Sequence, residues 1–211
     1  MSNDSKRRKP TGQTGPISIG PNGVSRHFIQ FPQSKADIEL IIAKVFCAGK
    51  AGMRQQIKRY GEFTDLQAQP ENSLDFRVET SLGHRWLELA EFAPLNEFGG
   101  QYENVSTTWC ADQMVRLFMD LVRKKNEKNY GAGVILVIYK THETLLIPPP
   151  VLRSLRVQLE RLQLTLESIY FLSPHDLEQA SVWEVWPGDP NDDGPTFQGG
   201  TVQIGFGDLI Q

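Results

Sequence analysis

Asp75 and Glu88 are the residues of this sequence whose types and spacing best suit chemistry. Residues 74–80 and 85–92 each read as a strand, and residues 81–84 read as a hairpin loop between them. Because side chains alternate with a period of two along a strand, this pairing predicts that the two carboxylates are diagonal neighbours on one face. Two such carboxylates suit Mg²⁺, which prefers oxygen ligands and keeps several waters. A metal held in this way can polarise a phosphodiester and activate water.

The same two residues also have an ordinary reading, as part of a solvated strand face. Asp75 shares its predicted face with Arg77 and Glu79, and Glu88 can pair with Arg77 across the hairpin. An exposed cross-strand ion pair of this kind contributes little to stability and requires no catalysis. Glu88 nevertheless lies on an otherwise apolar face, two residues from Trp86, so a carboxylate there needs a reason. The sequence leaves both readings open.

The order of elements around this pair resembles that of the PD-(D/E)XK, or restriction-endonuclease-like, nuclease superfamily. The resemblance covers about residues 36–140 and comprises a helix, the segment Leu74-Asp75-Phe76, the segment Trp86-Leu87-Glu88-Leu89-Ala90, a second helix and a buried strand. It implies a sandwich with an α-β-β-β-α-β core order. In that family an aspartate lies on the second strand and a Glu-x-Lys motif on the third.

The resemblance also implies roles for individual residues. Asp75 and Glu88 match the family's catalytic, metal-binding acids, which makes Mg²⁺ the implied cofactor. Ala90 stands where the family has a lysine that orients water and stabilises the developing charge. Lys140, at the end of the next strand, is the predicted substitute for that lysine, and Glu39 on the first helix is the predicted additional metal ligand. Because Ala90 replaces the lysine, a non-catalytic member of the superfamily fits the sequence as well as an active one.

Hydrophobic patterning predicts the elements that must position these residues. Helical spacing of apolar residues predicts helices from about residue 35, over 109–128 and over 150–166, and strand-like runs occupy residues 63–68, 74–80, 85–92, 134–139, 169–172 and 182–186. The run 134–139 is apolar without alternation, which is typical of a strand covered on both faces. We therefore expect an α/β fold, with a mixed sheet flanked by helices.

Composition divides the 211 residues into three parts. Residues 1–24 are rich in proline, glycine and basic side chains and are expected to be a disordered or extended tail. Residues 25–186 hold the predicted elements and are expected to form a single α/β domain. Residues 187–211 begin with an acidic, Gly/Pro-rich stretch that reads as a linker, and they end in a segment expected to dock on this domain or on another chain.

Charge and cysteine content disfavour several classes of protein. Residues 1–9 carry four basic side chains and one acid, whereas the remainder carries 18 basic and 24 acidic residues. An acidic body disfavours extensive phosphate binding, which needs many basic side chains on one face. Two cysteines form neither a disulfide framework nor a zinc site. No apolar stretch suits a membrane helix and none follows the basic N-terminal cluster, so a cytoplasmic protein is expected.

Together these features predict a non-catalytic protein-interaction or scaffold domain with a degenerate nuclease-like fold, as one component of a larger assembly. Such a domain needs no cofactor and binds its protein partner through the leucine stripe of residues 150–166 or through the C-terminal segment. A helix lying on its own sheet shows the same stripe, so this second reading stays open. The functional alternative is an Mg²⁺-dependent nuclease that acts on DNA or RNA through Asp75 and Glu88, with nucleic acid as its partner.

Overall fold

A computed structural model describes residues 13–15, 17–21, 23–48, 58–70, 73–98 and 110–188. Within these residues, six strands form the main sheet, in the spatial order β3, β4, β5, β6, β7, β8. They are β3 (Thr64–Ala68), β4 (Phe76–Thr80), β5 (Gly83–Glu91), β6 (Val134–Tyr139), β7 (Ser168–Pro174) and β8 (Ala180–Trp186). The helices are α1 (Lys35–Ala48), α2 (Ala111–Asn126) and α3 (Pro149–Leu159), and the short 3₁₀ helices are η1 (Lys58–Tyr60) and η2 (Leu95–Phe98).

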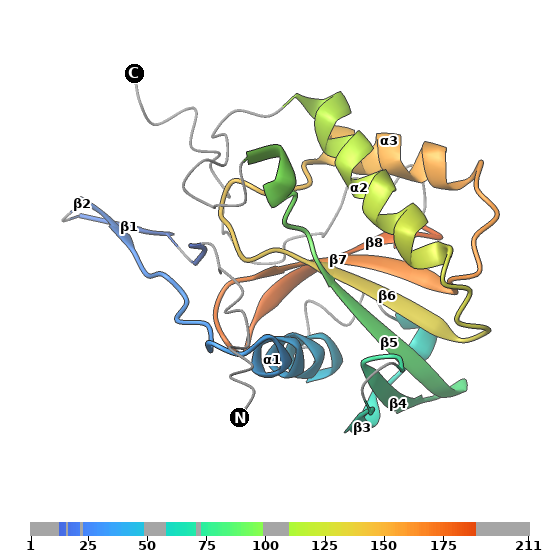
Figure 1. Cartoon of the computed structure of the whole chain (residues 1–211). Helices are drawn as coiled ribbons and strands as arrows, with labels where there is room; N and C mark the ends of the chain where they lie inside the picture. Colours follow the sequence, from blue (N-terminus) through green and yellow to red (C-terminus); the bar gives the residue numbers. More distant parts are fainter. Residues whose placement is uncertain are drawn as a thin grey trace, which may run out of the picture.

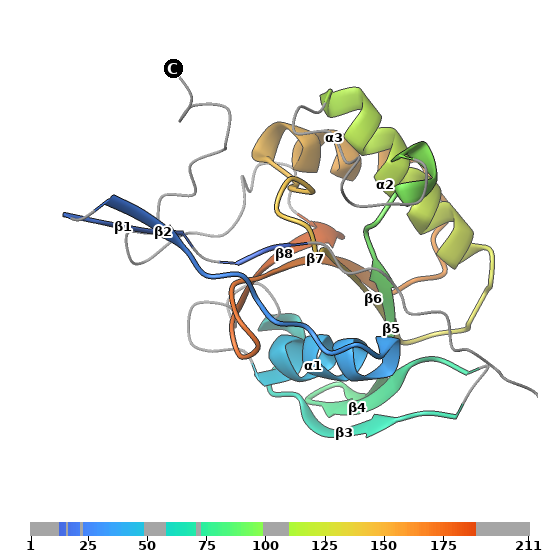
Figure 2. The ribbon, with the colours of Figure 1, turned by 60° about the vertical axis from the view of Figure 1, so that its left-hand side comes forward.

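The main sheet is mixed and lies between two helical layers (Figure 1). β3, β4 and β5 are antiparallel, β5, β6 and β7 run parallel, and β8 is antiparallel to β7. α1 covers one face, and α2 with α3 covers the other, as the second view also shows (Figure 2). The predicted α/β fold with a mixed sheet flanked by helices is therefore confirmed.

β6 lies in the middle of the sheet, and all six of its residues are buried. Its side chains alternate between two cores. Those packed with α2 and α3 are Val134, Leu136 and Ile138, and those packed with α1 are Ile135, Val137 and Tyr139. Because both faces of this strand are covered, its sequence has no polar position to alternate with, as the apolar run predicts.

The leucine stripe predicted as a docking surface belongs to the domain's own core. Leu152, Leu155 and Leu159 of α3 are fully buried against the sheet. The helix ends at Leu159, and Leu166 follows it in the segment before β7, where it is also buried. Docking of a partner on this stripe is therefore wrong, because these side chains have no free surface, and the reading as a helix on its own sheet is correct.

The hairpin between β4 and β5 has a tighter turn than the sequence pattern indicates. Thr80 pairs with Gly83, so Ser81 and Leu82 alone form the loop. The predicted loop over residues 81–84 is wrong because Gly83, with φ of 89°, already belongs to β5. Glycine adopts a positive φ without steric cost, so Gly83 can follow the turn directly and pair with Thr80. The register of the whole hairpin shifts with it.

A second, separate sheet overlaps the end of the predicted N-terminal tail, residues 1–24, and extends two residues beyond it. Its two antiparallel strands, β1 (Ile17–Gly20) and β2 (Gly23–Arg26), form a hairpin that projects from the main body in both ribbon views (Figures 1 and 2). All four residues of β2 are exposed. The hairpin is anchored at its base, where the N–H of Ile29 donates to the carbonyl of the buried residue Thr14.

The described residues end at Gly188, so the predicted C-terminal docking segment and most of the predicted linker lie outside them. The basic cluster near the N-terminus, within residues 1–12, lies outside them as well. Within the described ranges, no helix combines the length and the apolar character needed to cross a membrane.

Candidate functional site

Asp75 lies immediately before β4, where this strand stops pairing with β5. The ladder between the two strands ends at the pair Phe76–Leu87. One further step in this register brings Asp75 opposite Glu88. Its Oδ2 atom accepts a 2.6 Å hydrogen bond from the backbone N–H of Leu89, so the carboxylate replaces a strand partner for that group. The two acids are thus direct neighbours across the hairpin, and the predicted diagonal arrangement is wrong because the loop is shorter.

Glu88 is buried in β5, with 4% of its surface exposed. Its Oε1 atom accepts hydrogen bonds from Lys125 Nζ and from the Tyr130 hydroxyl, each at 2.6 Å. Lys128 Nζ lies 3.9 Å from the same oxygen. Burial of a carboxylate is unfavourable unless it is paired and hydrogen-bonded, and these three side chains provide both.

The pairing of Glu88 with Arg77 that the ordinary reading allows is not formed. Arg77 instead pairs with Glu79 on its own strand, at 2.6 Å, and both of these side chains are more than one-third exposed. The solvated part of this strand face therefore begins at Arg77, two residues after Asp75. Glu88 does not belong to it.

Lys125 is absent from the predicted site residues, yet it contacts both Glu88 and the backbone beside it. Its Nζ atom lies 3.3 Å from the carbonyl oxygen of Leu89. Lys125 occupies the last turn of α2, three residues after Val122 and seven after Phe118, both of which are buried. This helical spacing places it on the buried face and was the available signal. In the sequence, Lys125 is the last of three consecutive basic residues, Arg123 to Lys125, and this pattern indicates only cations that stabilise the C-terminus of the helix.

The charges around Asp75 act on it in opposite directions. Burial raises the pKa of Asp75, and the neighbouring charge of Glu88 adds to this effect. The hydrogen bond from Leu89 and the ammonium groups of Lys125 and Lys35 lower it in part. At Lys35, in the first turn of α1, burial opposes the charge, but the surrounding carboxylates raise the pKa above its usual value. The site thus brings α1, α2 and the β4–β5 hairpin within electrostatic reach of one another.

Tyr130 holds the Glu88 carboxylate in one orientation. Burial and the hydrogen bond to Glu88 raise the pKa of the Tyr130 hydroxyl, so it stays protonated and remains a donor at neutral pH. The ammonium of Lys128 lies 5.5 Å from the centre of the Tyr130 ring. A basic and an aromatic side chain therefore border the acid on the side of the segment that follows α2.

Glu39, the predicted additional metal ligand, lies on α1 and is 7% exposed. Its carboxylate pairs with Lys35 at 3.1 Å, and Lys35 in turn interacts with the charges of Asp75 and Glu88. Glu39 therefore borders the same site. Across the described ranges, however, no three histidine, cysteine, aspartate or glutamate side chains come close enough together to hold a metal ion. This arrangement does not include a third carboxylate ligand from α1.

Lys140, the predicted substitute for the missing lysine, is not brought together with the acids. Glu88 pairs with Leu136 of β6, and Lys140 lies four residues further along the chain, about 13 Å away at the rise of a strand. Lys140 is 3% exposed, and its ammonium donates to the carbonyl of Glu143 at 3.3 Å. Burial lowers the pKa of Lys140 to about 8. Because β5 and β6 pair in parallel with Glu88 opposite Leu136, Lys140 lies beyond the acids along the sheet.

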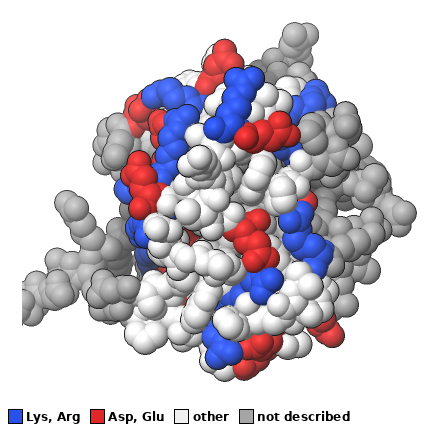
Figure 3. All heavy atoms as spheres, turned by 90° about the vertical axis from the view of Figure 1, so that its right-hand side faces the viewer, with Lys and Arg blue, Asp and Glu red and all other residues white. Residues whose placement is uncertain are grey.

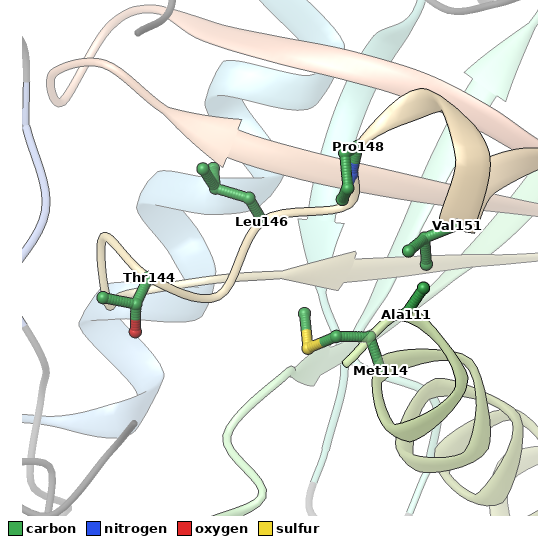
Figure 4. Close-up of a pocket in the computed structure, with 6 residues that line it drawn as sticks. All are labelled: Ala111, Met114, Thr144, Leu146, Pro148 and Val151. Carbon is green, nitrogen blue, oxygen red and sulfur yellow. The ribbon is translucent and has the colours of Figure 1, made fainter. Parts of the chain in front are cut away.

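A small cavity of about 170 Å³ lies apart from the acids, between the starts of α2 and α3 (Figure 4). It is lined by Ala111, Met114, Thr144, Leu146, Pro148 and Val151. Thr144 is the only residue of this lining with a polar side chain. The cavity therefore offers little to a charged substrate and does not compete with the acids as a candidate site.

Charged side chains of both signs share the face that lies on the right in Figure 1 (Figure 3). Basic and acidic groups lie beside one another there, with uncharged surface between them. This face has no continuous basic surface, so any contact with a polyanion on it is local.

Comparisons of the chain with protein-family models, with curated proteins and with solved structures give no match. The function of the site therefore has to be inferred from its own geometry.

Proposed function

We propose that this chain is a metal-dependent nuclease that hydrolyses phosphodiester bonds at the site formed by Asp75, Glu88 and Lys125. The observation that supports the proposal most directly is the 2.6 Å contact between Lys125 Nζ and Glu88 Oε1. Through it, α2 supplies the ammonium group that Ala90 does not provide on β5. Two carboxylates with a nearby lysine offer metal ligands and a positive charge for the transition state, which is what this chemistry requires.

The oxygen atoms around Lys125 fit a hard divalent cation such as Mg²⁺. In the described part of the chain, Asp75 and Glu88 each keep one carboxylate oxygen outside the hydrogen bonds given above. The carbonyl oxygen of Leu89 is directed to the same position, since it also contacts Lys125. Mg²⁺ is commonly bound through one or two carboxylates and retains waters, so a third acid is not required. The bound metal would polarise the phosphate and lower the pKa of a bound water.

The remaining roles belong to side chains that already surround Glu88. Tyr130 fixes the orientation of this carboxylate through its hydroxyl group. Lys125 stabilises negative charge that develops on the phosphate, since an ammonium on a flexible stem can reach it. Lys128 is about half exposed and lies 3.9 Å from Glu88, so it is placed to contact a neighbouring phosphate.

Incubation with Mg²⁺ or Mn²⁺ and three substrates, namely plasmid, single-stranded DNA and RNA, tests the proposal. We expect cleavage of at least one substrate, and its loss when the metal is chelated. Asp75→Asn and Lys125→Met are each expected to slow cleavage by about 10² or more, the contribution typical of a group that acts in the transition state.

Glu79→Gln is the matched control for these variants. Glu79 lies on the same hairpin and is paired with Arg77, outside the site, so its loss should leave cleavage unchanged. The proposal fails if the original protein cleaves none of the three substrates with either metal.

A non-catalytic interaction domain is the second candidate, and the β1–β2 hairpin favours it. This hairpin forms its own two-stranded sheet, and Val24 at its end is 56% exposed. Two-stranded hairpins are marginally stable in water, so a protein partner packed on this one would stabilise it. In this case Asp75, Glu88 and Lys125 form a structural ion cluster without catalysis.

Thermal unfolding with and without millimolar Mn²⁺ separates the two candidates. A ligand that binds the folded state raises Tm, so the nuclease predicts a rise that Asp75→Asn abolishes. The interaction domain predicts an unchanged Tm and no cleavage. It also predicts that Val24→Asp leaves Tm unchanged, since the exposed side chain of Val24 would contact only the partner.

A further inference from the structure

The ammonium group of Lys125 contacts oxygen atoms of two of the three residues proposed to bind the metal. Its Nζ atom is 2.6 Å from Glu88 Oε1 and 3.3 Å from Leu89 O, and its charge also acts on Asp75. These are the three residues whose oxygen atoms are proposed to bind the metal. An ammonium and a divalent cation cannot share one set of oxygen ligands, because their charges repel and their atoms would overlap.

The other donors at Glu88 do not compete in the same way. Tyr130 donates to Oε1 without carrying a charge, so it can stay in place beside a metal. The side chain of Lys128 is 53% exposed and lies 3.9 Å from Oε1, at the margin of the site. The side chain of Lys125, by contrast, is 17% exposed and reaches both the carboxylate and the carbonyl.

We infer that Lys125 is an internal counter-ion, which metal binding displaces from Glu88 and Leu89 toward the substrate phosphate. This inference rests on the metal-dependent function proposed above. Before the metal binds, the ammonium neutralises the buried carboxylate and satisfies the carbonyl. A metal bound to Leu89 O and to the second carboxylate oxygen of Glu88 would repel the ammonium, and the four-carbon stem lets the ammonium move away while its backbone stays in α2. Metal affinity is therefore set by a competition within the protein.

Isothermal titration calorimetry of the full chain with Mn²⁺ tests this competition. Lys125→Met and Lys125→Gln remove the competing charge, and each is expected to bind Mn²⁺ at least about tenfold more tightly than the original protein. The same variants are expected to lose cleavage, because no ammonium reaches the phosphate. A lysine with a purely structural role predicts the opposite binding result, since its loss would loosen the ligands and weaken Mn²⁺ binding.

Lys128→Met is the matched control, because it removes a cation near the same oxygen but leaves the position between the ligands filled. We expect it to change Mn²⁺ affinity by less than about twofold, as for exposed charges. Lys125→Gln keeps a hydrogen-bond donor and carries the test if Lys125→Met does not fold. Unchanged or weaker Mn²⁺ binding in the folded variants overturns the inference. Tighter binding in them, with no nucleic-acid cleavage by the original protein, supports the inference and rejects the nuclease function.

Discussion

Glu88 and Lys125 form a pair in which each side chain makes the burial of the other tolerable. Glu88 is almost completely buried, and Lys125 is its closest charged partner. Removal of one partner from a buried ion pair is more costly than removal of both, because the remaining charge is left without compensation. The stability of the domain should therefore depend on these two residues jointly.

Lys125→Met is expected to lower the free energy of unfolding by about 3 kcal/mol, the order found for an uncompensated buried charge. The double variant Lys125→Met with Glu88→Gln should recover most of this loss, since the charge is then gone as well. Urea unfolding of the four proteins in the cycle measures the coupling. A loss in the double variant equal to the sum of the two single losses would show that the pair does not interact.

The buried residue Lys140 gives a pH dependence that can be measured. Burial lowers its pKa to about 8 from the usual 10.5, so between these values the unfolded chain binds a proton that the folded chain lacks. The free energy of unfolding should therefore rise as the pH increases through this window. Below about pH 8 the lysine is protonated in both states, and the cost of burying its charge is fully present.

Lys140→Met is expected to remove this rise and to increase stability at neutral pH. Urea unfolding at several pH values between about 7 and 10.5 provides the measurement over the window in which the unfolded and folded states differ in protonation. Lys124→Met, at an exposed position of α2, is the control and should keep the slope. A slope that survives in Lys140→Met would show that another group is responsible.

At this scale the sequence predicts the acids but not the lysine that contacts them. Asp75 and Glu88 can be found because a short hairpin brings them together from neighbouring positions of the chain. Lys125 reaches Glu88 from a helix that packs over the sheet, and that distance depends on how α2 lies on the core. Lys140 is the predicted substitute lysine because it follows the next strand of the sheet. The register between β5 and β6 places it beyond the acids instead.

Among the helices and strands, those with a regular spacing of apolar residues are the ones that the sequence predicts best. β6 and α2 lie close to their predicted bounds, because the buried face of each follows its apolar pattern. α3 is an exception, since its leucine spacing continues to Leu166 but the helix ends at Leu159. The β4–β5 turn is different, since its register depends on the conformation of Gly83 and one glycine can serve either a loop or a strand. The direct pairing of the two acids could not be predicted for this reason.

The burial of α3 makes a prediction that separates core from interface. Leu155→Ala should destabilise the isolated domain by about 2–5 kcal/mol, as is typical for truncation of a fully buried leucine. Val157→Ala, at a position on the same helix that is 42% exposed, should cost less than about 0.5 kcal/mol. Denaturant unfolding checks both values. A small effect of Leu155→Ala would show that this leucine contributes little to the core.

On the scale of the whole molecule, the site lies where three layers of the fold meet. The β4–β5 hairpin supplies the acids, α2 supplies Lys125, and α1 supplies Lys35 with its partner Glu39. The hydrophobic pattern alone predicts the layers, because each helix has one apolar face to bury and β6 has two apolar faces that must both be covered by helices. It does not predict the angle at which the layers meet, and that angle decides which charged side chains share the site.

The end of the β4–β5 ladder leaves Leu89 of β5 without a strand partner on that side in the described residues, and side chains fill the position. Asp75 accepts its N–H, and Lys125 donates to its C=O. An unpaired strand edge is a template for self-association, so we expect these two contacts to protect the domain against aggregation.

Amide hydrogen exchange should report this protection residue by residue. In Asp75→Ala, the Leu89 amide is expected to exchange faster, while the amide of Val137 in the middle of the sheet keeps its protection. Uniform acceleration at both amides would indicate global destabilisation instead. The variant should also self-associate more readily than Glu79→Gln, which leaves the β5 edge intact. Residues proposed for catalysis would then be retained for solubility even in a chain that had lost its activity.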